Sequence, residues 1–254
     1  MSHLVSCRPQ SYGKHMDLAW AHLPTLGIKH VEMPIPTPDK IDEARKLLDA
    51  NGLSVGSFQG TCEVNDENVA ATMAAQCDVC KAFDTTRLFV SVKAGELDRQ
   101  IAYDRLRAAG DEAAKRDVII IMETHPDLVT NGDVGAETMA AVNHPNVRIN
   151  FDTANVYYYN EGVDAVGEIR KVLDYVEGIH LKDTDGGYKK HYFPTLGTGV
   201  VDYPTVVKLL TDRGYAGPFT IELKKTTGVE MTADEQKQYV ADSVAYLKQI
   251  GLLS

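Results

Sequence analysis

The segment Ile119–Asp127, IIIMETHPD, runs four apolar residues directly into Glu123, Thr124 and His125. A short apolar run of this kind is typical of a strand that is buried on both faces of a parallel sheet. A buried carboxylate without a partner is costly, so the strand either stops at a surface or opens into a polar site. The rest of the chain decides between these two possibilities.

Similar apolar runs recur along the chain and alternate with helical segments. The expected strands cover residues 4–7, 28–33, 53–58, 86–92, 117–123, 146–152, 176–182 and 218–223. Helical periodicity marks segments between and after them, including residues 39–52, 96–116, 202–215 and 234–251. Asn51 and Gly52 form a typical helix stop, and Asp202 with Pro204 forms a typical helix start.

This alternation predicts the fold class, because strands separated by helices imply a parallel sheet covered by helices. Eight such repeats in 254 residues match the size of a (β/α)8 TIM barrel, so we expect an α/β fold with a single domain over residues 1–254. The alternative is an open doubly wound sheet, which usually carries a glycine-rich phosphate turn after an early strand. None of the early turns has that sequence, which favours the barrel.

Composition and charge argue against several classes of protein. The net charge of −10 is unlike that of nucleic-acid-binding proteins, which usually present a basic face. The N-terminal sequence lacks a signal-peptide pattern, and no run approaches the roughly 18 apolar residues of a membrane helix. We therefore expect a cytoplasmic protein with no nucleic-acid or membrane partner.

The cysteines Cys7, Cys62, Cys77 and Cys80 are too few for a disulfide scaffold in a chain of 254 residues. Cys77 and Cys80 form a C-x-x-C pair within an expected helix, but no second pair completes a zinc site. We expect buried structural thiols, with a redox or metal role as the alternative.

Four polar residues end consecutive expected strands, from the fifth to the eighth, and they are Glu123, Asp152, His180 and Glu222. In a barrel these strand ends face one mouth, where active sites are built. Three carboxylates brought together repel one another unless they are protonated or bridged by a cation. One imidazole with three carboxylates suits a divalent metal, so we expect Mn²⁺, with Mg²⁺, Co²⁺ or Zn²⁺ as alternatives. The competing interpretation is a set of salt-bridged strand ends.

Two residues that follow these ligands are candidates for binding substrate. His125 comes two positions after Glu123 and Lys182 two positions after His180, so each pair faces one side if strand geometry continues. The alternatives are a hydrogen-bonded loop histidine at position 125 and a surface lysine at position 182.

Three more candidate substrate-binding residues end other strands. Arg8 and Glu32 follow the first two strands and are expected as pocket walls, and Asn155 follows the sixth strand. For Glu32 the alternative is a structural hydrogen bond to a neighbouring strand.

The strand ends METH, FDTAN, GIHLKD and IEL, with LGTGVVDY between the last two, resemble the xylose isomerase-like TIM-barrel superfamily. They look most like its sugar phosphate isomerase/epimerase branch, which includes ketose 3-epimerases and inosose-handling enzymes. The resemblance covers nearly the whole chain and is clearest from Val118 to Leu223. It implies that Glu123 and Glu222 flank a metal-bound substrate, one removing a proton beside a carbonyl and the other returning it on the opposite face. It also implies that His125 faces the substrate.

Elementary chemistry agrees with this expectation. A metal bound to a carbonyl and the neighbouring hydroxyl stabilises the cis-enediolate that forms when the intervening proton is removed. Two carboxylates on opposite sides can then exchange protons. We therefore expect a divalent-metal-dependent epimerase or isomerase acting on a small sugar or cyclitol, with Glu123 and Glu222 as acid and base.

Departures from the family pattern keep other functions open. Asn155 and Gln59 stand where relatives carry histidine, which leaves the epimerase subgroup open. The first alternative is a metal-dependent lyase or hydratase acting on 3-keto-sugars or keto-glycosides, and the second is a non-catalytic sugar-binding barrel. Endonuclease relatives use extra histidines for three zinc ions, and this acidic chain lacks them. Such barrels commonly form homo-oligomers, so a homo-oligomer is also an open expectation.

Overall fold

A closed barrel of parallel strands forms the centre of the computed structural model, which describes residues 3–224, 226 and 228–253. The strands are β1 Val5–Cys7, β2 His30–Pro34, β3 Ser54–Gln59, β4 Arg87–Val90, β5 Ile119–Glu123, β6 Val147–Asp152, β7 Val176–Leu181 and β8 Phe219–Ile221. Each strand pairs with its neighbours in chain order, and β1 closes the ring on β8. The predicted (β/α)8 barrel is confirmed, and the open doubly wound sheet is wrong.

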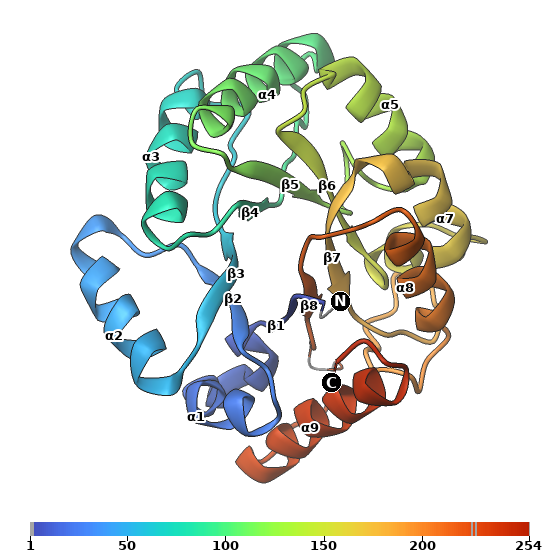
Figure 1. Cartoon of the computed structure of the whole chain (residues 1–254). Helices are drawn as coiled ribbons and strands as arrows, with labels where there is room; N and C mark the ends of the chain where they lie inside the picture. The colour runs from blue at the N-terminus through green and yellow to red at the C-terminus, as the bar shows by residue number, and fades with distance from the viewer. Residues whose placement is uncertain (1–2, 225, 227, 254) are drawn as a thin grey trace.

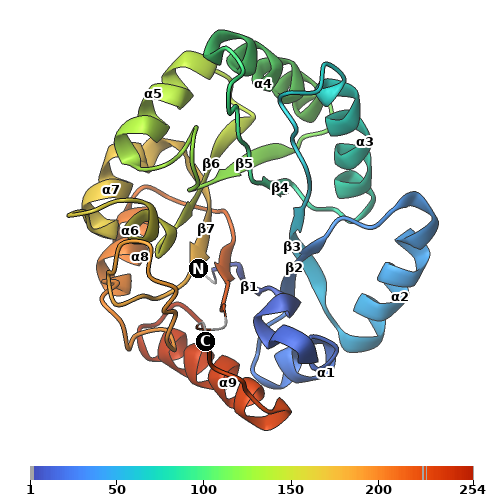
Figure 2. The ribbon, with the colours of Figure 1, turned by 180° about the vertical axis from the view of Figure 1, so that it is seen from behind.

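The helices form a ring around the barrel, seen from opposite sides in Figure 1 and Figure 2. They are α1 Leu18–Thr25, α2 Ile41–Asn51, α3 Val69–Ala82, α4 Arg99–Ala114, α5 Gly132–Val142, α6 Asn155–Tyr159, α7 Ala165–Val172, α8 Tyr203–Asp212 and α9 Ala233–Gln249. Short 3-10 helices lie in the connections, namely η1 Pro9–His15, η2 Pro38–Lys40 and η3 Leu173–Tyr175. Within the described ranges, no helix combines the length and the apolar character needed to cross a bilayer.

The predicted start of α8 and the predicted end of α2 are both confirmed. The Asp202 side chain accepts a hydrogen bond from the backbone N–H of Thr205 (3.1 Å) at the start of α8. Gly52 ends α2 in the left-handed conformation, with φ of 63°, which favours glycine.

The predicted strands differ from the observed ones only at their ends. The segment predicted as 86–92 ends as a strand at Val90. Beyond that residue the chain leaves β5, and the backbone N–H of Ala94 donates to the Asp127 carboxylate instead (2.9 Å). After Val90 the backbone is therefore held by a hydrogen bond to a loop side chain and no longer by pairing within the sheet.

The apolar runs supply the core, as their composition predicts. Ile120 and Ile149 are completely buried, and burying a side chain of this size stabilises the fold by about 1.5–3 kcal/mol. All four cysteines are free and buried, as predicted for structural thiols. Burial raises the pKa of the Cys62 thiol to about 12, which keeps it neutral and weakly reactive.

Candidate metal centre

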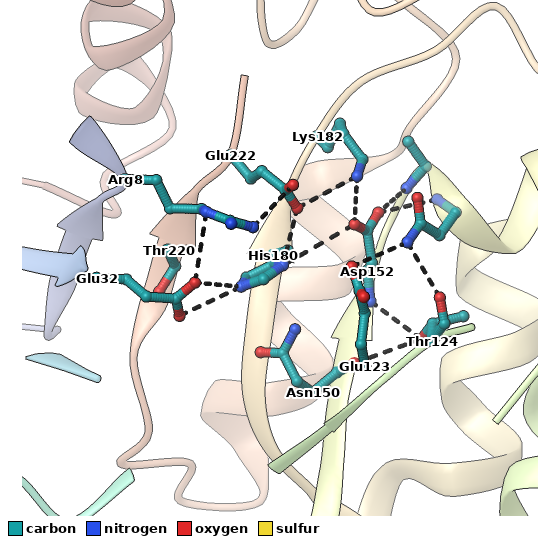
Figure 3. A network of polar contacts seen from close by, with 12 residues as sticks. Arg8, Glu32, Glu123, Thr124, Asn150, Asp152, His180, Lys182, Thr220 and Glu222 are labelled. Atoms are coloured by element: carbon teal, nitrogen blue, oxygen red, sulfur yellow. Dashed lines mark hydrogen bonds and ion pairs between the residues drawn. The ribbon is translucent and has the colours of Figure 1, made fainter. Parts of the chain in front are cut away.

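Glu123, Asp152, His180 and Glu222 come together at the carboxyl end of the barrel (Figure 3). Each residue offers one ligand atom, and these atoms all lie within 4.8 Å of one another. Glu123 ends β5, Asp152 ends β6, His180 lies near the end of β7, and Glu222 directly follows β8. The residues singled out in the sequence as strand ends are therefore neighbours in space.

A shift in the pairing of β6 with β7 sets part of this arrangement. The ladder skips one residue of β7 after Ile149, so that Asn150 pairs with Gly178 and Asp152 pairs with His180. A Cβ at Gly178 would overlap the ends of the Ile121 and Asn150 side chains, so a larger residue there would displace them. Bulges of this kind re-aim side chains next to active sites.

Asp152 presents one of its two carboxylate oxygens to the cluster. Its Oδ1 accepts hydrogen bonds from the backbone N–H groups of Ala154 (2.9 Å) and Asn155 (2.8 Å). Its Oδ2 lies 2.6 Å from Lys182 Nζ and 3.9 Å from His180 Nδ1. The backbone contacts fix the carboxylate and turn Oδ2 toward the other ligands.

His180 is completely buried, and its two ring nitrogens have different partners. Nε2 lies 3.0 Å from Glu32 Oε1, and Nδ1 lies 2.9 Å from Glu222 Oε2. Burial alone would lower the pKa of the imidazole, but the charges of Glu32 and Glu222 outweigh it and raise the pKa to about 10. The protonated ring is thus a cation surrounded by carboxylates, which shows that this position favours positive charge.

The two glutamates of the cluster have opposite pKa shifts. Burial would raise the pKa of Glu222, but the positive charges of Lys182, Arg8 and His180 lower it well below its usual range. Burial, followed by the charge of Glu222, raises the pKa of Glu123. One carboxylate is therefore held ionised while the other binds a proton more readily, a separation that suits an acid and base pair.

Lys182 lies inside the cluster, so the interpretation of this residue as a surface lysine is wrong. Its side chain is 1% exposed, and its Nζ lies 3.2 Å from Glu222 Oε2 in addition to its contact with Asp152. The ammonium also lies 5.5 Å from the centre of the Phe193 ring. Burial would lower its pKa, but the surrounding carboxylates raise it and keep the group charged.

Asn155 and Arg8 also contact the ligands, each through one glutamate. Asn155 Nδ2 donates to Glu123 Oε1 (3.2 Å) and to the carbonyl oxygen of Thr124 (3.1 Å). An Arg8 terminal nitrogen lies 2.8 Å from Glu222 Oε1. Glu32 is fully buried and reaches the cluster through His180.

His125 makes the contacts of a loop histidine. Its Nδ1 lies 2.7 Å from the carbonyl oxygen of Pro126, and its ring meets the Tyr159 ring edge-on at 4.9 Å between centres. These contacts match the hydrogen-bonded loop histidine considered from the sequence. A role for His125 in binding substrate stays a prediction.

Asp183 organises the connection after β7, a part that sequence reasoning missed. Its carboxylate accepts hydrogen bonds from the backbone N–H groups of Thr184, Gly197, Gly199 and Val201. A Cβ at Gly199 would overlap Asp183 Oδ1, which explains one glycine of the LGTGVVD segment. The available signal was an aspartate directly after HLK, followed by two closely spaced glycines.

Three further residues shape the centre without a signal in the sequence. The Thr124 hydroxyl accepts the backbone N–H of Asp152 (3.1 Å), and the Ser57 hydroxyl donates to Glu32 (2.6 Å). The Phe89 ring packs against the His180 ring at 4.6 Å between centres. Residues of these types are common in strands, so only their position in space shows what they do.

The donor set fits a divalent cation. Asp152 Oδ2 and His180 Nδ1 are buried and make no hydrogen bond of acceptable geometry, although charged neighbours lie within ion-pair distance. Both residues belong to the group whose ligand atoms converge within 4.8 Å. Three carboxylates and one imidazole nitrogen, with no sulfur, are ligands that Mn²⁺, Mg²⁺, Co²⁺ or Zn²⁺ accept.

Two curated relatives match part of the sequence. L-ribulose-5-phosphate 3-epimerase from Salmonella typhi is 27% identical over 135 residues, which cover 53% of this chain and 46% of that protein. 3-dehydroshikimate dehydratase from Bacillus anthracis is 23% identical over 131 residues, which cover 45% of this chain and 46% of that protein. The chain thus spans about half the length of the curated relatives it matches.

A solved structure and a family model each match almost the whole chain. A xylose isomerase-like TIM barrel protein from Mycobacterium smegmatis, solved in complex with magnesium, has the same fold with a TM-score of 0.77 at 21% identity. That comparison covers 98% of this chain and 97% of the solved one. The family described as "Xylose isomerase-like TIM barrel" matches residues 20–250. Because this match spans most of the sequence, the chain belongs to the xylose isomerase-like TIM barrel family.

Proposed function

We propose that the protein is a divalent-metal-dependent epimerase or isomerase of a small sugar or cyclitol. The observation that carries this proposal is the position of two glutamates: Glu123 reaches the ligand cluster from β5, and Glu222 reaches it from the end of β8. Because two strands separate β5 from β8 in the barrel, the carboxylates approach from different sides. This arrangement suits removal of a proton from one face of a carbon and its return to the other.

Glu123, Asp152, His180 and Glu222 would hold the cation. A bound divalent cation supplies positive charge that stabilises negative charge developing on adjacent substrate oxygens. Mn²⁺ is our first choice from the donor set, and the magnesium in the Mycobacterium smegmatis protein supports Mg²⁺ as an alternative. Co²⁺ and Zn²⁺ also suit these ligands.

The two glutamates take different parts in proton transfer. We assign Glu222, whose carboxylate contacts Lys182 and Arg8, as the group that removes the proton beside the carbonyl. We assign Glu123, which reaches the cluster from β5, as the group that returns a proton on the other side. The hydrogen bond from Asn155 Nδ2 to Glu123 Oε1 fixes the direction of that carboxylate (3.2 Å).

Groups for binding a sugar surround the cluster. A cavity of about 340 Å³ lies between η1 and the segment after β8, and it is lined in part by Arg8, Lys14, Glu222 and Lys224. This volume is at the small end of the range for ligand pockets, which suits a small molecule. Arg8, Lys182 and His125 are our candidates for binding substrate, and of these three Arg8 lines the cavity. We take the barrel as one catalytic domain because all of these residues come from it.

A metal-dependent lyase or hydratase is the second candidate, and the dehydratase from Bacillus anthracis favours it. The same base would remove the proton beside a carbonyl, and a substituent on the next carbon would then leave in place of the proton returning. The two functions share the proton-removal step, so the product distinguishes them.

The experiment follows hydrogen exchange in deuterated water by NMR. Ketohexoses, pentulose phosphates, inososes and 3-keto-glycosides are each incubated with the protein and Mn²⁺. We expect one class to gain deuterium beside the carbonyl and to form a stereoisomer. We expect Glu222→Gln to lose this exchange with an unchanged circular dichroism spectrum, and Glu137→Gln, at an exposed position on α5, to keep it.

Each of the other outcomes would change the proposal, either in the reaction or in the residue that acts as base. Release of a substituent would establish the lyase. Exchange that survives in Glu222→Gln would show that another group is the base. Binding of metal and sugar with no exchange in any substrate class would favour a non-catalytic sugar-binding barrel.

A further inference from the structure

Glu32, on β2, touches the candidate metal centre without taking part in the steps above. It is 0% exposed, so protein atoms surround its carboxylate on all sides. Both of its oxygens lie close to His180 Nε2, at 3.0 and 3.3 Å. The Ser57 hydroxyl donates to Oε2 at 2.6 Å. Figure 3 shows this carboxylate on the side of the imidazole that faces away from Asp152.

An irregular pairing between β2 and β3 creates the contact with Ser57. Val31 pairs with Val55, but the next residue, Glu32, pairs with Ser57, so the ladder skips Gly56. In a regular ladder Glu32 would stand opposite Gly56, which has no side chain and therefore no hydroxyl to donate. The backbone irregularity thus supplies the hydrogen bond that fixes the carboxylate.

We propose that Glu32 is a positioning residue of the metal centre and that Ser57 holds it in place. A neutral imidazole has one N–H donor and one lone pair. In the neutral ring that binds a metal, Glu32 would accept the N–H of Nε2 and so leave the lone pair on Nδ1, the nitrogen that lies 2.9 Å from Glu222 Oε2. Metal-binding histidines commonly donate their second ring nitrogen to a carboxylate in this way. The inference rests on the proposed metal site.

Arg8 extends this positioning from His180 to a second ligand. Arg8 Nε lies 3.6 Å from Glu32 Oε1, and a terminal nitrogen of the same side chain lies 2.8 Å from Glu222 Oε1. A buried carboxylate is costly unless it is paired, and here the arginine and the hydroxyl partner it. Glu32, Arg8 and Glu222 therefore form a chain of contacts that holds two ligand residues in one geometry before a metal arrives.

The test measures Mn²⁺ affinity by calorimetry in metal-free protein, side by side with thermal stability. We expect Glu32→Gln and Ser57→Ala to raise the Kd for Mn²⁺ by about 10- to 100-fold, the usual cost of losing a group behind a metal ligand. The matched control is Glu168→Gln, which alters another buried glutamate whose contacts are Gly132 N–H and Lys171. We expect this control to lower stability and leave the Kd unchanged.

A second measurement separates positioning from a general loss of structure. In Mg²⁺-loaded protein labelled with ¹⁵N-histidine, we expect the Nε2–H signal of His180 in the wild type and its shift or loss in Glu32→Gln. Unchanged Mn²⁺ affinity in both variants would overturn the inference. If Glu32→Gln does not fold, Ser57→Ala decides by the same affinity measurement. A wild-type protein that binds none of the four metals would instead overturn the proposed function, and the inference with it.

Discussion

The ammonium group of Lys182 lies 2.6 Å from Asp152 Oδ2, within the set of residues that would bind the metal. It also lies 3.2 Å from Glu222 Oε2. The side chain therefore compensates the charges of two buried carboxylates and holds them close to each other. A metal bound at the proposed site would share these oxygens with the ammonium.

Replacing Lys182 by methionine tests this compensation. Removing one partner of a buried ion pair costs about 3–5 kcal/mol, so we expect the metal-free variant to unfold at a clearly lower temperature than wild type. Saturating Mn²⁺ should recover most of the difference, because the cation takes over the compensation. Thermal unfolding with EDTA and with Mn²⁺ measures both effects.

The control for that variant is Lys208→Met, which removes an exposed pair with Asp212 (2.7 Å). Exposed pairs contribute about 0–1 kcal/mol, so its unfolding temperature should change little in either condition. If Lys182→Met is destabilised equally with and without Mn²⁺, the cation does not replace the lysine in neutralising the two carboxylates.

Removing the metal should lower the stability of the folded protein. At a free Mn²⁺ concentration of about 100 times Kd, a ligand that binds only the folded state adds about 2.7 kcal/mol of stability. We expect EDTA-treated protein to gain this stabilisation on addition of Mn²⁺, measured by thermal unfolding. Asp152→Asn should abolish the gain, because Asp152 is one of the four residues whose ligand atoms converge.

The exposed aspartate Asp212, at the end of α8, provides the control for this series. Asp212→Asn should retain the full Mn²⁺ response. A response that survives in Asp152→Asn would place the metal at other residues.

The four residues of the candidate metal centre could be predicted from the sequence because each one lies at or next to the end of an apolar strand. In a parallel barrel all strand ends of one polarity meet at one mouth, so position along the chain translates directly into position in space. Glu123 after IIIM is the clearest case, and the structure places it beside Asp152, His180 and Glu222.

The surroundings of the ligands could not be predicted in the same way. The contact of Glu32 with Ser57 depends on a residue skipped at Gly56, and the pairing of Asp152 with His180 depends on one skipped near Gly178. The strands are largely continuous apolar runs, so their sequence does not mark the position at which the pairing shifts. Burial of Lys182 likewise depends on carboxylates from other strands.

Gly199→Ala is expected to disturb the connection between β7 and α8. Its Cβ would overlap Asp183 Oδ1 and the Thr184 carbonyl oxygen, so the anchored loop must move. Because Asp183 directly follows Lys182, we expect activity to fall by more than about 10-fold, as misplacement near a reacting centre commonly costs that much. Activity and limited proteolysis of residues 184–202 measure the change.

Gly214→Ala is the matched control, since Gly214 has φ of 77° and no atom within 4 Å of an added Cβ. It should lose about 1–2 kcal/mol of stability from the left-handed backbone alone and keep its activity. Identical losses of activity in the two variants would show that the anchoring by Asp183 is not needed for function.

Asn155 gives the last prediction, because its amide links Glu123 Oε1 (3.2 Å) to the Thr124 carbonyl oxygen (3.1 Å). Asn155→Ala removes the donor, and a hydrogen bond to a charged group contributes about 1.5–3 kcal/mol, so the rate of hydrogen exchange should fall about 10- to 100-fold. Asn155→Asp keeps the size of the side chain but sets a second carboxylate against Glu123, so it should lose more activity than alanine. We therefore expect the exchange rate to be highest with asparagine, lower with alanine and lowest with aspartate. An aspartate variant at least as active as the alanine variant would show that this contact does not position the acid.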